Sequence, residues 1–306
     1  MQPIQHVTIF GAGAMGAVYA SLFFEMNPAC VSFMAKGERA ERLRTQGIIV
    51  NEKHYAIPVV TPEDLSPPSD LIIVALKHHR LQEALPDLKY RVGDDTIFLS
   101  VMNGLDSEAM IGAMYGSEKV LYAIAVGIDA LREDSKVVYT NQGKIFFGEA
   151  ENPTLTERVK RVQDFFERAG IIYETPQDMI RLLWWKFMIN VGVNQSSAVL
   201  RAPFGVFQKS EDARALMETA MREVVELAQA ANVNLVEEDI RNWYNFLFTL
   251  SPNGKTSMLQ DLEAGRKTEV EIFGGKVVEL SKTYSIPTPV NQTLLRIIKV
   301  LESSYR

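Results

Sequence analysis

The chain has 306 residues, of which 47% are hydrophobic and 23% are charged, so it can bury a sizeable core and form two domains. Its formal net charge of -6 gives no reason to expect nucleic acid or an anionic membrane as a partner. The single cysteine, Cys30, excludes a disulfide framework and a multi-cysteine metal site, and we expect the protein in a reducing cytoplasm.

The first predicted element is a buried strand over residues 7–10, which leads into glycines at G-x-G-x-x-G spacing. Gly11 permits a tight turn into a helix over residues 17–25, Gly13 lets the backbone approach a diphosphate, and Gly16 lets the helix pack closely on the sheet. Three glycines also occur in ordinary flexible turns, but a strand before them and a helix after them favour a dinucleotide site at the helix N-terminus. The loop consists of Gly11, Ala12, Gly13, Ala14, Met15 and Gly16.

Residues 7–24 carry no charge and could be mistaken for a signal-peptide core or a membrane span. They lack a preceding basic region and contain three glycines. We therefore expect neither a secretory signal nor a transmembrane helix.

The first half of the chain alternates strands and helices, which is typical of a Rossmann-like, doubly wound parallel sheet in an α/β fold. Strands are predicted over residues 30–34, 71–76, 96–102, 120–126 and 171–174, and helices over 39–46 and 154–169. Residues 137–139 and 144–147 are predicted to pair as an antiparallel hairpin at the edge of the sheet.

From about Pro176 the pattern contains helices only, so we expect a cofactor domain at residues 1–176 and an all-helical substrate domain at residues 177–306. The helices are predicted over residues 179–200, 212–231, 237–250, 257–265, 269–284 and 289–304. A ligand would lie in a cleft between the domains, near the carboxyl ends of the strands, where Lys77 and Asn103 emerge.

The residues after the second predicted strand bear on the choice of cofactor. An NAD-binding domain usually carries an acidic residue about 20 positions past the glycine loop, where it accepts hydrogen bonds from the ribose 2'-hydroxyl. Here Lys36 holds that position, followed by Arg39 and Arg42, and these cations suit the 2'-phosphate of NADP. The same residues, with Glu38 among them, also fit the charged face of a surface helix.

Lys186, Asn190 and Asn194 recur at i, i+4 and i+8, and therefore form one polar stripe on an otherwise apolar predicted helix. An unsatisfied buried polar group costs roughly 1 to 3 kcal/mol, so we expect the stripe to face a ligand cleft. The alternative is a lysine that snorkels to solvent and two asparagines that bond neighbouring helices.

Taken together, these residues resemble the ketopantoate reductase family over almost the whole chain. The motifs that carry the resemblance are the glycine loop, Leu76-Lys77, Asn103-Gly104, Trp185-Lys186-x-x-x-Asn190-x-x-x-Asn194, and Thr256-Ser257-Met258-Leu259-Gln260-Asp261 continuing to Lys267-Thr268-Glu269. The sequence departs from the family pattern at Phe204, where the family often has asparagine, and at Lys36, where arginine is commoner.

The resemblance implies NADPH-dependent reduction of 2-dehydropantoate to (R)-pantoate, on the pathway to pantothenate and coenzyme A. It implies that Lys186 is the general acid, and that Asn190, Asn194 and Ser257 bind the substrate. Leu76, Lys77 and Asn103 would contact the nicotinamide-ribose side of the cofactor, and Glu269 would lie where cofactor and substrate meet.

Simpler interpretations of these motifs remain. Ser257 and Gln260 also fit an N-cap and capping box, Asn103-Gly104 fits a turn, and Glu269 fits a surface carboxylate. At the level of function, a related dehydrogenase of opine or 3-hydroxyacid type would reduce another 2-oxo acid, and an NADP(H)-binding sensor would keep the fold without catalysis.

Two further expectations concern metals and assembly. The four histidines do not form ligand spacing with acids, so we expect no metal site. Residues 237–250 hold more apolar side chains than one face of a short helix hides, which favours a homodimer through the helical domain. The side chains concerned are Trp243, Tyr244, Phe246, Leu247 and Phe248.

Overall fold

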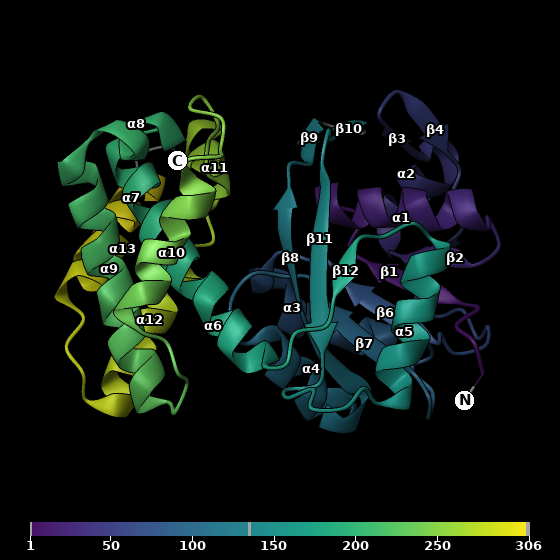
Figure 1. The fold of residues 1–306 in the computed structure, drawn as a ribbon. Helices are drawn as coiled ribbons and strands as arrows, with labels where there is room; N and C mark the ends of the chain where they lie inside the picture. The colour runs from purple at the N-terminus through teal and green to yellow at the C-terminus, as the bar shows by residue number, and fades with distance from the viewer. Residues whose placement is uncertain (1, 134–135, 304–306) are drawn as a thin grey trace. The chain divides into compact units, whose positions relative to one another are not determined.

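The computed structural model describes residues 2–133 and 136–303, and the chain divides into two compact units, Met1–Met179 and Ile180–Arg306. Figure 1 shows strands and helices mixed in the first unit and helices in the second. The described residues therefore confirm an α/β fold in which a Rossmann-like sheet is followed by a helical region.

Within the described residues, the first unit contains an eight-stranded sheet in the order β12-β11-β8-β7-β6-β1-β2-β5. The strands are β1 Val7–Phe10, β2 Val31–Met34, β5 Val59–Val60, β6 Leu71–Val74, β7 Ile97–Ser100, β8 Val120–Ile128, β11 Gln142–Gly148 and β12 Tyr173–Glu174. From β5 to β8 all neighbours are parallel, whereas β11 runs antiparallel to β8. All four residues of β1, β6 and β7 are buried, as expected for parallel strands covered on both faces.

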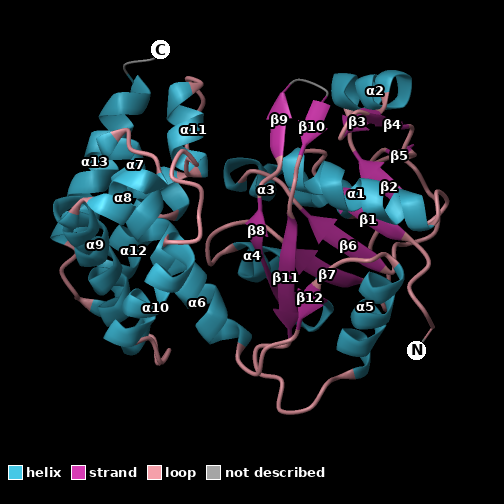
Figure 2. Ribbon diagram, turned by 45° about the horizontal axis from the view of Figure 1, so that its top comes forward, coloured by secondary structure: helices cyan, strands magenta, loops and turns pink. Residues whose placement is uncertain are grey.

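Helices cover both faces of this sheet (Figure 2). On one face, Phe23 of α1 (Ala14–Met26) packs against Phe165 and Phe166 of α5 (Glu157–Arg168). On the other face, a second apolar cluster includes Leu81 of α3 (His78–Ala84) and Ile111 of α4 (Ser107–Tyr115). The other described helices of this unit are α2 Gly37–Gln46, η1 Leu85–Leu88 and η2 Ser117–Lys119.

A separate four-stranded sheet, β4-β3-β10-β9, corrects one prediction. Its strands are β3 Ile48–Val50, β4 Lys53–Tyr55, β9 Leu131–Glu133 and β10 Lys136–Val138. The hairpin predicted from residues 137–139 and 144–147 is wrong, because β10 pairs with β9 and β3 while β11 pairs with β8. Between β10 and β11, the N–H groups of Thr140 and Asn141 donate hydrogen bonds to the carboxylate of Asp129, so this connection is held by a residue outside both strands.

The described part of the second unit is helical. Its elements are α6 Met179–Ile189, a π-helical segment η3 Asn190–Asn194, α7 Gln195–Leu200, α8 Phe204–Lys209, α9 Glu211–Ala230, α10 Glu237–Leu247, α11 Ser257–Glu263, η4 Val270–Ile272, α12 Gly274–Tyr284 and α13 Pro289–Ser303. The helix predicted over residues 269–284 is interrupted, because the backbone at Phe273 leaves the helical region between η4 and α12. The predicted end of the last helix, Ser304, lies outside the described residues.

In the ranges that the structure describes, no helix is both long enough and apolar enough to cross a membrane.

Candidate functional site

The glycine loop connects β1 to α1 through positions at which a side chain cannot fit. Gly11 has φ +124°, and a Cβ there would lie 2.4 Å from the carbonyl oxygen of Ala75. A Cβ on Gly16 would lie 1.9 Å from the Gly11 carbonyl oxygen. These two glycines are therefore required by the fold of the loop itself, as the spacing predicted.

Gly13 differs from both, because its nearest neighbour to an added Cβ would be the Ala75 oxygen at 3.9 Å. The space beside its backbone is thus open within the protein. Gly13 also caps α1 without a side-chain hydrogen bond, and the first turn of this helix carries no acidic residue. Uncapped N–H groups beside an open glycine backbone have the donor chemistry that a diphosphate requires.

The order of the sheet brings the other expected cofactor residues to the same edge. The strands β7, β6, β1 and β2 are adjacent and parallel, so the segments that follow them emerge together. Asn103 follows β7, Leu76 and Lys77 follow β6, and Lys36 follows β2. Lys77 is exposed and is the N-cap residue of α3, whereas Leu76 and Asn103 are partly buried.

Lys36 contacts a carboxylate at this edge. Its Nζ lies 2.8 Å from an oxygen of Asp87 in η1, and the hydrogen bond from this lysine to Asp87 raises the pKa of the Lys36 ammonium. The Lys36 side chain is 56% exposed. The ammonium group of Lys36 is therefore paired with the Asp87 carboxylate of the protein itself.

The loop that carries Asn103 rests on a buried polar network that the sequence did not reveal. The Oγ atoms of Ser100 and Ser107 are 2.7 Å apart, and Ser107 donates a 2.8 Å hydrogen bond to the Glu108 carboxylate. Glu108 is only 6% exposed, and burial raises its pKa to about 7. Only the tertiary fold buries this glutamate, since its neighbours in sequence give no sign of it.

In the helical unit, Lys186 lies on α6 and the two asparagines bound the π-helical segment. Lys186 and Asn190 are partly buried, Asn194 is 5% exposed, and the Asn194 amide lies 3.4 Å from the Asn190 side-chain oxygen. The prediction of one uninterrupted helix over residues 179–200 is therefore corrected. Short π-helical segments inside α-helices occur frequently at functional sites.

Close packing accompanies this segment. A Cβ on Gly192 would lie 2.5 Å from the Met221 side chain of α9 and 3.0 Å from the Met217 carbonyl oxygen. The backbone of the π-helical segment thus approaches α9 more closely than a residue with a side chain would allow. Its asparagines are consequently presented from a rigid support.

Ser257 opens α11, which packs on the π-helical segment, and its side chain is exposed. The cap of this helix is Thr256, whose Oγ1 accepts a hydrogen bond from the Leu259 N–H at 3.2 Å. The interpretation of Ser257 as N-cap is therefore wrong. Thr256 also donates a 3.1 Å hydrogen bond to Ser197 of α7, which ties the start of α11 to the helix that directly follows the π-helical segment.

Glu269 directly precedes η4 and is partly buried. The segment η4 packs against α12 and α13, so the position of this carboxylate depends on the carboxyl-terminal helices. Thr268 beside it donates a 2.6 Å hydrogen bond to Glu302 of α13, which fixes the turn.

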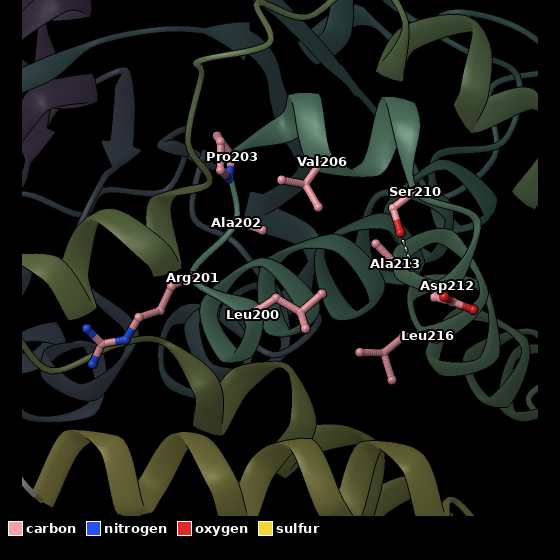
Figure 3. A pocket seen from close by; sticks show the side chains of 9 residues that line it. All are labelled: Leu200, Arg201, Ala202, Pro203, Val206, Ser210, Asp212, Ala213 and Leu216. Carbon is pink, nitrogen blue, oxygen red and sulfur yellow. Dashed lines mark hydrogen bonds between the residues drawn. The ribbon is translucent and has the colours of Figure 1, made fainter.

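A cavity of about 350 Å³ occurs elsewhere in the helical unit (Figure 3). Figure 3 shows the apolar side chains of Leu200, Val206 and Leu216 around it and the guanidinium of Arg201 directed away from them. The remaining lining residues are Ala202, Pro203, Ser210, Asp212 and Ala213. The lining of this cavity contains none of the predicted substrate residues.

Among the residues in the ranges 2–133 and 136–303, no group of three or more histidine, cysteine, aspartate or glutamate side chains is arranged to hold a metal ion.

Comparison with known proteins connects both units to one family. A family model described as ketopantoate reductase PanE/ApbA matches residues 7–152, and its C-terminal counterpart matches residues 178–302. The chain is 28% identical to a 2-dehydropantoate 2-reductase of Pyrococcus horikoshii, with 97% of each chain covered. It is 27% identical to a protein of that name from Archaeoglobus fulgidus, with 98% of this chain and 99% of the relative covered.

Solved structures show the same fold. A D-mandelate dehydrogenase with NADH and anilino(oxo)acetate superposes with a TM-score of 0.88 at 21% identity, covering 98% of this chain and 99% of the other. A dimeric ketopantoate reductase from Staphylococcus aureus superposes with a TM-score of 0.82 at 19% identity, covering 98% and 100% of the two chains.

Proposed function

Since this chain belongs to the ketopantoate reductase family, we propose that it reduces 2-dehydropantoate to (R)-pantoate with NADPH, a step toward pantothenate and coenzyme A. The observation that supports this proposal most strongly is the match of both family models, in order, across both halves of the chain. We assign cofactor binding to residues 1–176 and substrate binding to residues 177–306.

The loop from Gly11 to Gly16 would hold the cofactor diphosphate, because its open backbone at Gly13 and the uncapped first turn of α1 fit an anion. Lys77 and Asn103 would contact the nicotinamide ribose, and Leu76 would pack beside it. NADPH, when bound, supplies the hydride of the reaction. The protein must then orient the ketone, stabilise the developing alkoxide and provide one proton.

Lys186 would provide that proton. Its ammonium polarises the carbonyl oxygen of the substrate and then donates a proton to the alkoxide as the negative charge develops. Lysine suits this task because its ammonium group combines a positive charge with a transferable proton.

Neutral donors around the lysine would position the substrate. Asn190, Asn194 and Ser257 offer amide and hydroxyl hydrogens to the substrate carboxylate and hydroxyl without an additional charge. Glu269 would orient the reacting groups where cofactor and substrate meet. The close packing of Gly192 on α9 supports this assignment, because residues that position a substrate need a well-defined backbone.

A second candidate function is reduction of another 2-oxo acid. It is favoured by the fold shared with the D-mandelate dehydrogenase, a protein solved with NADH and an oxo-acid ligand. The alternative of a sensor without catalysis is disfavoured by the presence of Lys186, both asparagines, Ser257 and Glu269 in one chain.

A spectrophotometric assay with a panel of 2-oxo acids separates these functions. The panel contains 2-dehydropantoate, pyruvate and phenylglyoxylate, each with NADPH and with NADH. We expect the highest kcat/KM for 2-dehydropantoate with NADPH. A higher value for phenylglyoxylate would favour the second candidate, and no oxidation of NADPH with any oxo acid would favour the sensor.

We also propose that this chain forms a homodimer through its helical unit; the S. aureus ketopantoate reductase is described as dimeric. Phe246 and Phe248, at the end of α10, are 49% and 58% exposed and would contribute to this interface. Trp243 and Leu247 are buried, so they do not belong to the apolar surface that the sequence predicted. We expect the mass measured by light scattering to rise from 34.4 kDa toward twice that value as concentration increases. A monomer mass at every concentration would rule out this assembly.

A further inference from the structure

The π-helical segment η3, which carries the proposed substrate residues Asn190 and Asn194, departs from ordinary helical bonding at its end. In an α-helix the backbone N–H of Gln195 would bond the carbonyl oxygen of Val191, four residues earlier. Here this N–H bonds the Gly192 carbonyl oxygen. The Gln195 side chain serves Val191 in its place, because its Nε2 donates a 2.9 Å hydrogen bond to the Val191 oxygen.

Gln195 is held in turn by Asn291 of α13, and both side chains are completely buried. The Gln195 amide donates a second hydrogen bond, 2.8 Å long, to Asn291 Oδ1. The Asn291 amide donates to the Ala220 carbonyl oxygen at 3.0 Å and to the Glu223 carboxylate at 2.7 Å, both on α9. All four amide hydrogens of the two side chains therefore have an acceptor.

Glu223 sets the direction of this chain of hydrogen bonds. Its carboxylate is 8% exposed and also accepts hydrogen bonds from the backbone N–H groups of Val290 and Asn291, in the first turn of α13, at 2.8 and 3.0 Å. Because these partners are all donors, the Asn291 nitrogen faces Glu223 and the Asn291 oxygen faces Gln195. The Gln195 nitrogen must then lie between Asn291 and Val191.

The oxygen of the Gln195 amide, by contrast, is unpaired. This Oε1 is buried and has no hydrogen-bond partner among the residues that the structure describes. It lies against the backbone of Gly274, where an added Cβ would collide with it. A buried acceptor without a donor destabilises the folded state, and an apolar side chain of similar size would avoid that cost. What Gln195 provides is therefore its two donors, one for η3 and one for the network behind it.

We infer that Gln195 is a positioning residue, which holds the π-helical backbone so that Asn190 and Asn194 meet the substrate at the required spacing. The inference rests on the proposed function and concerns a side chain that is too deeply buried to touch the substrate itself. A change of one residue in helical register rotates the following residues by about 100° and shifts them by about 1.5 Å. A displacement of that size at a substrate contact can cost about a hundredfold in rate.

The test compares two glutamines in the full-length protein. Gln195→Met keeps the length of the side chain and removes both donors. Gln208→Met is the matched control, because the Gln208 amide also donates two hydrogen bonds, to the carbonyl oxygens of Leu247 and Leu250, each at 2.9 Å. Neither acceptor of the control belongs to η3. Both variants should lower Tm, since each loses two hydrogen bonds.

Only Gln195→Met should impair catalysis. With saturating NADPH we expect its kcat/KM for 2-dehydropantoate to fall by about tenfold to hundredfold, and that of Gln208→Met to stay within about twofold of native. The loss should appear mainly in KM, because Lys186 lies in α6, before the π-helical segment. Equal kcat/KM in the two variants at a temperature where both are folded would overturn the inference.

Hydrogen exchange provides a readout that does not depend on activity. The backbone N–H groups of residues 186–200 should exchange faster in Gln195→Met than in the native protein and in Gln208→Met. Unchanged exchange in Gln195→Met would overturn the inference. If Gln195→Met does not fold, Asn291→Ala supplies the same comparison, since it removes the acceptor that holds Gln195 and leaves the sequence of η3 intact.

Failure of the inference and failure of the proposed function can be told apart. If the native protein reduces 2-dehydropantoate and Gln195→Met is as active as Gln208→Met, the positioning role is wrong and the function stands. If the native protein reduces another 2-oxo acid instead, the proposed function is wrong, and the same kinetic comparison with that acid decides the inference. If it reduces none, hydrogen exchange alone decides.

Discussion

The glycine loop and the segment from Lys186 to Asn194 are built in opposite ways. In the loop, the missing side chains of Gly11 and Gly16 allow close contacts, and the groups offered to a ligand belong to the backbone. In the helical segment, the backbone is fixed by the close approach of Gly192 to α9, and the groups offered belong to side chains. Backbone groups suit a phosphate that many enzymes bind, whereas side chains carry chemistry that is particular to one reaction.

The largest effect is expected when the side chain of Lys186 is removed from the helical segment. Lys186→Ala should lower kcat by about 10² to 10⁴-fold, which is the usual contribution of general acid catalysis. Lys186→Arg should fail almost as badly, because a guanidinium with a pKa above about 12 releases its proton too reluctantly. Steady-state kinetics on 2-dehydropantoate measure both. Recovery of most activity in the arginine variant, with the loss in alanine confined to KM, would show that Lys186 only anchors the substrate.

Within the glycine loop, two alanine substitutions separate the effect on NADPH binding from the effect on stability. Gly13→Ala should fold normally, because its Cβ meets no atom closer than 3.9 Å, but it should weaken NADPH on the order of tenfold by filling the approach to the diphosphate. Gly16→Ala should lower Tm as well, since its Cβ would lie 1.9 Å from a carbonyl oxygen. Thermal unfolding and NADPH fluorescence titration distinguish the two. Native NADPH affinity in Gly13→Ala would contradict the assigned role of that glycine.

A further test concerns the buried polar network of Ser100, Ser107 and Glu108 beside the loop that carries Asn103. Burial raises the pKa of Glu108 from 4.5 to about 7, so the folded state holds this proton more tightly than the unfolded state. The resulting stability is fully present below about pH 4.5 and is lost as pH rises through 7. Between pH 5 and 8 the native protein should therefore lose about 2 kcal/mol more stability than Glu108→Gln. Urea unfolding at both pH values measures this difference, and parallel pH dependence in the two proteins would contradict it.

The sequence predicted most of what is local. Buried strands such as residues 71–76 and the glycine loop follow from side-chain type and spacing, and the structure contains them. Whether two segments pair depends on which other strands are available in the fold. The hairpin predicted from residues 137–139 and 144–147 was wrong because β10 pairs with β3 and β11 pairs with β8. The π-helical segment was also missed, because the residues from Asn190 to Asn194 fit the periodicity of an ordinary α-helix, and the contact of Gly192 with α9 appears only in the folded protein.

The candidate site likewise contains residues that the sequence predicted and residues that it missed. Lys186, Asn190 and Asn194 were predicted as site residues because helical periodicity places them on one stripe, and their role stays a prediction. Thr256 was missed as the cap of α11 because Thr and Ser are adjacent and both cap helices well, so that only the hydrogen bond to Leu259 decides between them. Gln195 and Glu108 gave no signal, since the first bonds a helix 96 positions away and the second is buried by its fold.

The central claim is that cofactor binding belongs to the first unit and proton transfer to Lys186 of the second. The most direct measurement is the NADPH dissociation constant of Lys186→Ala, obtained by fluorescence titration without substrate. We predict a value within about twofold of the native constant, although turnover is lost. NADPH affinity weakened tenfold or more would contradict the claim, because Lys186 would then belong to the cofactor site.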